Sequence, residues 1–190
     1  MRILSAALVV AAVIGAGVLP NLTPREGSAA TRAASGSPSR GDLGPLPEFA
    51  GATGWLNSAP LSRAELKGKV VVVDVWTFAC SNCQAALPYV KALHERYAPK
   101  GLVVVGVHTP ELKIEFDRAN VERAVKKLGV VYPVVLDNDY KIWTALGNRY
   151  WPSIYIVDRT GRIRYHFDGE GDYAQQEKIV RQLLAEQPGA

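Results

Sequence analysis

The stretch that decides the fold is VVVDVWTFACSNC, residues 71–83. A run of β-branched and apolar residues ends there in a Cys-x-x-Cys pair, and Cys80 and Cys83 are the only cysteines of the chain. A continuous apolar run of this length is typical of a strand that is covered on both faces of a sheet. We therefore expect a buried strand over 70–76 that brings the cysteine pair to one edge of the sheet.

Strand and helix patterns alternate downstream of this stretch. The pattern predicts strands over 102–107, 134–136, 153–157 and 162–167, and helices after the cysteines, over 117–128, over 139–146 and from Asp172 onward. Asp172 and Gln175 come close to a capping-box pattern. Alternating strands and helices that finish in a hairpin and a helix predict an α/β fold with a central mixed sheet flanked by helices. The early strands should be parallel and the final pair antiparallel.

Length and composition favour one globular domain with an N-terminal tail. The chain has 190 residues, of which 48% are hydrophobic and 21% are charged. Of the net charge of +4, residues 1–40 supply +3, and the remaining 18 basic and 17 acidic residues supply +1. Because no basic groove follows from this distribution, nucleic acid is not an expected partner.

The N-terminus has the features of an export signal. Residues 3–19 are almost purely apolar and follow Arg2. This length fits a long signal peptide and also a minimal membrane span, so residues 1–20 are expected to be a cleaved signal or a retained membrane anchor. Residues 21–45 are expected to be a disordered linker, and 46–190 the folded domain. Either form places the domain outside the cytoplasm, in the periplasm or cell envelope, where cysteine pairs can persist oxidised.

The cysteine spacing favours redox chemistry. A helix that begins at the pair would place Cys80 at its N-terminus, where unpaired backbone N–H groups and the helix dipole stabilise a thiolate. Cys80 is then the attacking nucleophile. Cys83, one turn further on, is the resolving thiol that attacks the mixed disulfide and releases the product.

Three other uses of the pair are less consistent with the sequence. Zinc needs four ligands, but no second cysteine pair exists, and His94, His108 and His166 are far apart in sequence. Covalent haem needs a histidine directly after the second cysteine, where Gln84 stands. A purely structural disulfide across so short a loop would add little stability.

Several motifs, in order along the chain, resemble a known family. They are Gly68-Lys69-Val70-Val71, Trp76-x-x-x-Cys80-x-x-Cys83 with Pro88 beyond it, Gly106-Val107-His108-Thr109-Pro110-Glu111, Leu136-Asp137-Asn138-Asp139-Tyr140 and Gly147-Asn148-Arg149-Tyr150-Trp151-Pro152. Over residues 46–185 the chain resembles the thioredoxin superfamily, its TlpA-like extracytoplasmic branch, and within it the soluble thioredoxin-like domain of DipZ proteins. The resemblance implies a thioredoxin fold with an N-terminal extension and an extra helix inserted after the second core strand.

Asp74 is the one charged residue of the central apolar strand. A buried carboxylate is costly unless it has a partner or a role, and in thioredoxins the matching acid helps to take the proton from the resolving thiol. The resemblance therefore implies that Asp74 has a raised pKa and acts on Cys83 through water. The alternative is a strand residue that points to a wet edge.

The resemblance also assigns residues around the pair to substrate binding. Pro152 is expected to be the cis-proline of the superfamily, beside which the Trp151 backbone would pair with an extended substrate segment. An ordinary proline at a strand start is the alternative. Trp76 is expected to shield the disulfide, with plain core packing nearly as consistent. Ser81 and Asn82 carry no charge, which predicts a weakly or moderately reducing pair rather than a strong oxidant.

His108 and Glu111 follow a strand that should run parallel to the first, so they are expected at the same sheet edge as the cysteines. By resemblance to some TlpA-like reductases, Glu111 is a candidate for tuning the disulfide. A solvated loop role is equally consistent with both residues.

Together these patterns predict an exported protein disulfide oxidoreductase, a reductant or electron carrier. Its expected partners are the thiols and disulfides of substrate proteins and a membrane electron donor or acceptor. It is expected to be a monomer that uses no cofactor beyond its own cysteine pair and no metal. The alternative is a thiol-based copper carrier for oxidase assembly, since thiolates suit Cu(I), but Met1 is the only methionine. A peroxidase would use a lone attacking cysteine, which the tight pair does not fit.

Overall fold

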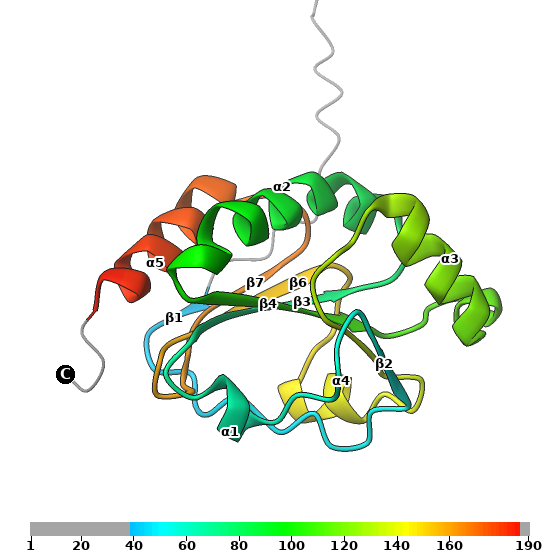
Figure 1. The fold of residues 1–190 in the computed structure, drawn as a ribbon, viewed down its shortest axis with the longest axis horizontal. Helices are drawn as coiled ribbons and strands as arrows, with labels where there is room; N and C mark the ends of the chain where they lie inside the picture. Colours follow the sequence, from blue (N-terminus) through cyan, green and yellow to red (C-terminus); the bar gives the residue numbers. More distant parts are fainter. Residues whose placement is uncertain (1–38, 187–190) are drawn as a thin grey trace, which may run out of the picture. The chain divides into compact units, whose positions relative to one another are not determined.

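The computed structural model describes residues 39–186, which form one mixed sheet with helices on both faces (Figure 1). The strands are β1 Ser39–Arg40, β2 Gly54–Leu56, β3 Val70–Trp76, β4 Leu102–His108, β5 Val134–Leu136, β6 Ser153–Val157 and β7 Ile163–Asp168. The helices are α1 Arg63–Leu66, α2 Ser81–Tyr97, α3 Arg118–Leu128, α4 Lys141–Leu146 and α5 Tyr173–Ala185, with 3-10 turns η1 Ala98–Lys100 and η2 Lys113–Glu115. In Figure 1, α2, α3 and α5 cover one face of the sheet, and α1 and α4 lie on the other.

The strand order in this part of the chain is β1-β7-β6-β3-β4-β5-β2. β3, β4 and β5 pair in parallel, whereas β6 pairs antiparallel with both β3 and β7. The mixed sheet, its parallel early strands and the final hairpin are confirmed. So is the extra helix, α3, which lies between β4 and β5. The edge strand β2, which pairs antiparallel with β5, was not predicted because it spans only three residues.

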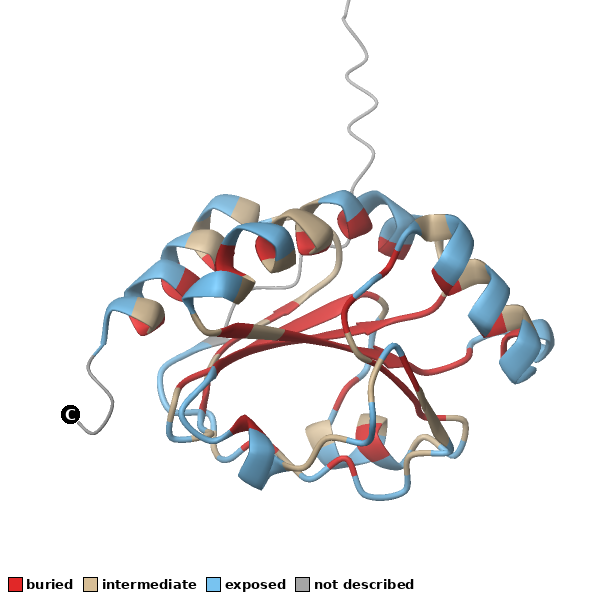
Figure 2. Cartoon of the chain, viewed as in Figure 1, coloured by how far each residue is buried: buried red, intermediate tan, exposed pale blue. Residues whose placement is uncertain are grey.

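The central strand β3 is buried along its whole length. Successive side chains of a strand point to opposite faces, so the valines divide between two cores. Val70 and Val72 join the cluster under α2, α3 and α5, and Val71, Val73 and Val75 join the cluster on the other face. Figure 2 shows the central strands as buried, with exposed residues on the outer sides of the helices. Asp74 is the only charged side chain in this strand.

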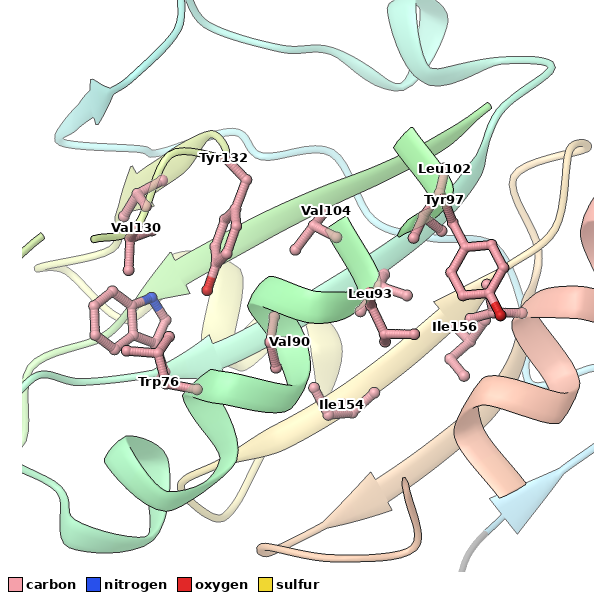
Figure 3. Close-up of a cluster of buried hydrophobic side chains, with 14 of the residues drawn as sticks. Trp76, Val90, Leu93, Tyr97, Leu102, Val104, Val130, Tyr132, Ile154 and Ile156 are labelled. Carbon is pink, nitrogen blue, oxygen red and sulfur yellow. The ribbon is translucent and has the colours of Figure 1, made fainter. Parts of the chain in front are cut away.

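Helix α2 packs on the sheet through the face that the sequence predicted. Its residues Ala86, Val90, Leu93 and Tyr97 are all buried. Figure 3 shows Val90, Leu93 and Tyr97 against the strand residues Val104, Ile154 and Ile156. This packing fixes the position of the helix start, which holds the cysteines.

Two predictions need correction in the described residues. The linker was expected to reach residue 45, but β1 pairs with β7 and the Leu43 N–H donates to the Ile163 carbonyl oxygen at 2.9 Å. An added edge strand of only two residues leaves no periodic signal. The capping box at α5 is absent: Asp172 has a φ of 52°, and its carboxylate accepts a hydrogen bond from the Tyr165 hydroxyl at 2.5 Å.

The predicted signal or anchor over residues 1–20, and the linker over 21–38, lie outside the described residues. None of the helices within residues 39–186 is long and apolar enough to cross a membrane.

Candidate active site

The cysteine pair lies at the end of β3, where the chain turns into α2. Cys80 is the N-cap residue of α2, and its sulfur accepts a hydrogen bond from the Cys83 backbone N–H at 3.1 Å. Both cysteines are free thiols; Cys80 is partly exposed and Cys83 is buried. One thiol therefore faces solvent at a helix N-terminus while the other lies behind it in the core.

The two thiols differ in acidity because their surroundings differ. A hydrogen bond from the Cys83 side chain, with further bonds from the Cys83 and Asn82 backbone, lowers the pKa of Cys80 to about 7 against the effects of burial and of the Glu111 charge. Burial raises the pKa of Cys83, and the hydrogen bond with Cys80 adds to the rise. The nucleophile is therefore Cys80, and Cys83 needs a base to lose its proton.

Asp74 lies in β3 beneath the pair and is 3% exposed. Burial raises its pKa from 3.8 to about 7, with a smaller effect from the Cys80 charge. The Asp74 charge in turn contributes to the raised pKa of Cys83. The structure thus shows the buried carboxylate next to the thiols rather than a side chain at a wet edge. A carboxyl group with a pKa near neutrality is suited to exchange a proton with a thiol.

The side chains of Trp76 and His108 both lie in the core. Trp76 is 1% exposed and packs in the same core cluster as Cys83, which agrees with the core-packing alternative. His108 is the last residue of β4 and is fully buried, with its ring edge-on to Trp76 and stacked on Phe78. Its Nε2 lies 3.2 Å from Thr77 Oγ1, and burial lowers its pKa to about 4. It is therefore a neutral core residue below the active loop, not a solvated one.

Glu115 is a site residue that the sequence analysis missed. Its carboxylate is buried and accepts hydrogen bonds from the backbone N–H groups of Ala79 at 2.8 Å, Glu111 at 2.8 Å and Leu112 at 2.7 Å. It thereby joins the loop that precedes Cys80 to the loop that follows β4. The only sequence signal is an acid between the apolar residues 114 and 116, which does not show that the carboxylate turns inward.

The loop before β6 completes the site. The Trp151–Pro152 peptide bond is cis, as expected, and Pro152 is buried. The Trp151 indole N–H donates to the Thr109 carbonyl oxygen at 3.0 Å, and its ring lies 4.1 Å from that of Trp143. Hydrogen bonds therefore link this loop to the one after β4, just as Glu115 links the latter to the cysteine loop.

The remaining predicted site residues are exposed at this edge. Ser81 and Asn82 begin α2, and Glu111 stands in the loop after β4. The charge of Glu111 reaches the cysteine, since it acts to raise the pKa of Cys80. Within residues 39–186, no group of three or more His, Cys, Asp and Glu side chains is arranged to hold a metal ion.

The chain that carries this site is similar to known proteins. The model of the Redoxin family matches residues 41–184. The chain belongs to the Redoxin family.

Relatives with the same domain include proteins of very different length. The protein DipZ of Mycobacterium tuberculosis is 46% identical over 144 residues, which cover 74% of this chain and 21% of DipZ. This chain therefore spans about a fifth of the length of DipZ. The thiol-disulfide oxidoreductase YkuV of Bacillus subtilis is 31% identical over 143 residues, covering 75% of this chain and 95% of YkuV. The solution structure of a thioredoxin-like protein in its oxidised form superposes with a TM-score of 0.67 at 32% identity, covering 75% of this chain and 96% of that one. The fold is the thioredoxin fold.

Proposed function

We propose that this protein is an exported thiol–disulfide oxidoreductase that exchanges its Cys80–Cys83 dithiol with the disulfides of protein substrates. The observation that carries the proposal is the division between the two thiols. Cys80 caps α2, is partly exposed and has a pKa of about 7, whereas Cys83 is buried behind it with a raised pKa. The name of YkuV, which this chain matches over 95% of its length, supports the same activity.

The reaction has two displacement steps. The Cys80 thiolate attacks one sulfur of a substrate disulfide, forms a mixed disulfide and releases the first substrate thiolate. Asp74 then takes the proton of Cys83, and the Cys83 thiolate attacks the Cys80 sulfur. The second substrate thiolate leaves, and the Cys80–Cys83 disulfide forms. Two electrons pass from the dithiol to the substrate, whose disulfide becomes two thiols.

We infer that the pair acts as a reductant or electron carrier. Strongly oxidising pairs have a nucleophilic cysteine with a pKa near 3.5, because the reduced thiolate is strongly stabilised. The pKa of Cys80 is about 7, and the neighbouring Ser81 and Asn82 add no positive charge. A potential closer to about −270 mV than to about −120 mV is therefore expected.

The proposed location is outside the cytoplasm, either free or held by an N-terminal anchor. The apolar run over residues 3–19 supports this proposal. There the protein would need a membrane partner to renew its dithiol or to receive its electrons. A thiol-based copper carrier is the rival function, and two thiols alone would have to bind the metal.

The variant Cys83→Ser tests the function because it stops the reaction after the first step. Expressed in the native organism, it should accumulate covalent complexes with partner proteins that disappear on reduction. Cys80→Ser, which lacks the nucleophile, is the matched control and should form none. A Cys83→Ser variant that traps no partner, together with a wild-type protein that binds Cu(I) and fails to reduce a protein disulfide, would overturn the proposal in favour of a metal carrier.

A further inference from the structure

Among the buried polar atoms of residues 39–186 that have no hydrogen-bond partner, three belong to side chains that surround Gly106 on the α2 side of the sheet. They are Asp74 Oδ1, Trp76 Nε1 and the Tyr132 hydroxyl. All three side chains are almost completely inaccessible to solvent. Buried polar groups in proteins are nearly always paired, so three in one place call for a common explanation.

Gly106 brings these groups together. It is paired with Asp74 in the parallel register of β3 and β4, which places the two residues on neighbouring strands roughly 4.8 Å apart. A Cβ on Gly106 would lie 2.9 Å from Trp76 Nε1 and 3.3 Å from Tyr132 Cε2, so the missing side chain makes room for both rings. Because Cε2 is bonded to the carbon that carries the hydroxyl, the polar end of Tyr132 lies at this position. Figure 3 shows Tyr132 and Trp76 next to each other, to one side of α2.

The other groups around Asp74 and Tyr132 come from several elements. The ring of His94, in α2, lies with its centroid 5.7 Å from that of Tyr132, and its Nδ1 also has no partner among residues 39–186. Cys80 and Cys83 approach Asp74 from α2, and Ile154 is its paired residue on β6. The charge of Asp74 also contributes to the raised pKa of Tyr173 at the start of α5. His108 lies two residues beyond Gly106 on β4 and is neutral, because burial lowers its pKa to about 4. No lysine or arginine of the described residues contributes to the pKa of Asp74. An ionised Asp74 therefore depends on uncharged donors for stabilisation.

We propose that Tyr132 is a positioning residue whose hydroxyl donates a hydrogen bond to one water molecule, which bridges it to the Asp74 carboxylate. The proposal rests on the proposed function, in which Asp74 accepts the proton of Cys83. Burial and the Asp74 charge both raise the pKa of Tyr132, so the phenol keeps its own proton and acts only as a donor. By stabilising the ionised form of Asp74, it keeps the base available near neutral pH. The Trp76 indole N–H is a second donor at the same position.

The test follows the Cys83 step alone with 5,5′-dithiobis(2-nitrobenzoate). Cys80 attacks the reagent and releases one coloured thiolate; Cys83 then releases the second in a phase whose rate does not depend on reagent concentration. The rate of this second phase is measured between about pH 5.5 and about pH 9.5, a range wide enough to cover the titration of a group with a pKa of about 7. Wild-type protein should give a profile governed by Asp74.

Tyr132→Phe removes only the hydroxyl and should move the midpoint of this profile upward by roughly one pH unit, since a hydrogen bond to a charged group is lost. The rate at pH 7 should fall about five-fold, and the two profiles should converge at high pH. In an Asp74→Asn background, Tyr132→Phe should have no further effect on the midpoint. The matched control is Tyr155→Phe, a buried tyrosine on the opposite face of the sheet whose hydroxyl donates to Asn148.

A Tyr132→Phe profile that overlays the wild-type profile, or that is lowered equally at every pH, would overturn the proposal, because a structural role changes the rate without moving the midpoint. Failure of the proposed function has a different signature: the wild-type protein would show no second phase at all, and the Cys83→Ser and wild-type traces would be the same.

Discussion

The replacement of Asp74 by Asn should stabilise the protein in a strongly pH-dependent way. The carboxyl group lies inside β3, and burial raises its pKa from 3.8 to about 7. Below pH 4 both the folded and the unfolded state hold the proton, so Asp74 adds no pH dependence. Between pH 4 and pH 7 the unfolded state releases the proton while the folded state keeps it. The free energy of unfolding therefore falls as the pH rises through this window.

The size of the effect follows from the pKa difference. A change of one in pKa corresponds to about 1.4 kcal/mol, so the rise from 3.8 to about 7 corresponds to about 4 kcal/mol. Domains of this size unfold with a free energy of only about 5–15 kcal/mol. The asparagine side chain of Asp74→Asn does not titrate, so the free energy of unfolding of this variant should not fall between pH 4 and pH 7 for this reason. It should exceed the wild-type protein in stability by about 4 kcal/mol more at pH 8 than at pH 4, which is roughly 10 °C in Tm.

Urea unfolding of the reduced protein, followed by tryptophan fluorescence from pH 4 to pH 8.5, measures this difference directly. Asp158→Asn provides a control whose stability difference from the wild-type protein should stay nearly constant over this pH range. Although burial acts to raise its pKa, hydrogen bonds from Thr160, Arg162 and Arg164 lower it overall. Asp158 therefore contributes stability at neutral pH that is lost as the pH falls below its unfolded value. If the stability difference between Asp74→Asn and wild-type protein stays constant from pH 4 to pH 8.5, the buried carboxyl does not titrate as described and the reasoning is refuted.

Three further predictions concern the same edge of the sheet. Alkylation of the reduced protein by iodoacetamide should modify Cys80 with a midpoint near pH 7 and leave Cys83 unmodified in the folded state. Peptide mapping measures the modification of each thiol, and equal modification of both would contradict the assigned roles. Glu111→Gln should lower the alkylation midpoint of Cys80, because the Glu111 charge raises its pKa, and an unchanged midpoint would remove Glu111 from the site. Glu115→Ala leaves the backbone N–H groups of Ala79, Glu111 and Leu112 without their acceptor. The free energy of unfolding in urea should fall by roughly 2 kcal/mol, whereas a fall below about 0.5 kcal/mol would show that water replaces the carboxylate.

Much of the fold follows from patterns that are local in sequence. The continuous run of apolar residues predicts β3 to the residue, and helical spacing predicts the buried face of α2. Strands too short to show a period escape this reasoning. Both β1 and β2 are held by pairing with distant strands, β7 and β5, rather than by their own sequences.

The environment of the site residues is where local patterns fail. His108 and Glu115 are polar residues near loops, a position that favours exposure, yet both are buried by segments distant in the chain. For Trp76 the sequence left both shielding of the disulfide and core packing open, and the glycine at position 106 on the neighbouring strand leaves room for its indole inside. These outcomes depend on which strands become neighbours, which no local pattern records.

The sequence by itself determined the chemistry of this protein: the spacing of Cys80 and Cys83 at the junction of a strand and a helix assigns one thiol to the helix N-terminus and the other to its first turn. Only the tertiary structure decided which groups lie near these thiols and can exchange protons with them. Asp74 has a pKa near neutrality because β4, β6 and α2 together exclude water from it, and the ring of Tyr132 fits beside Gly106 because that residue has no side chain. The acidity of the nucleophile Cys80 depends on its position at the start of α2, whereas the basicity of Asp74 depends on its burial in the core.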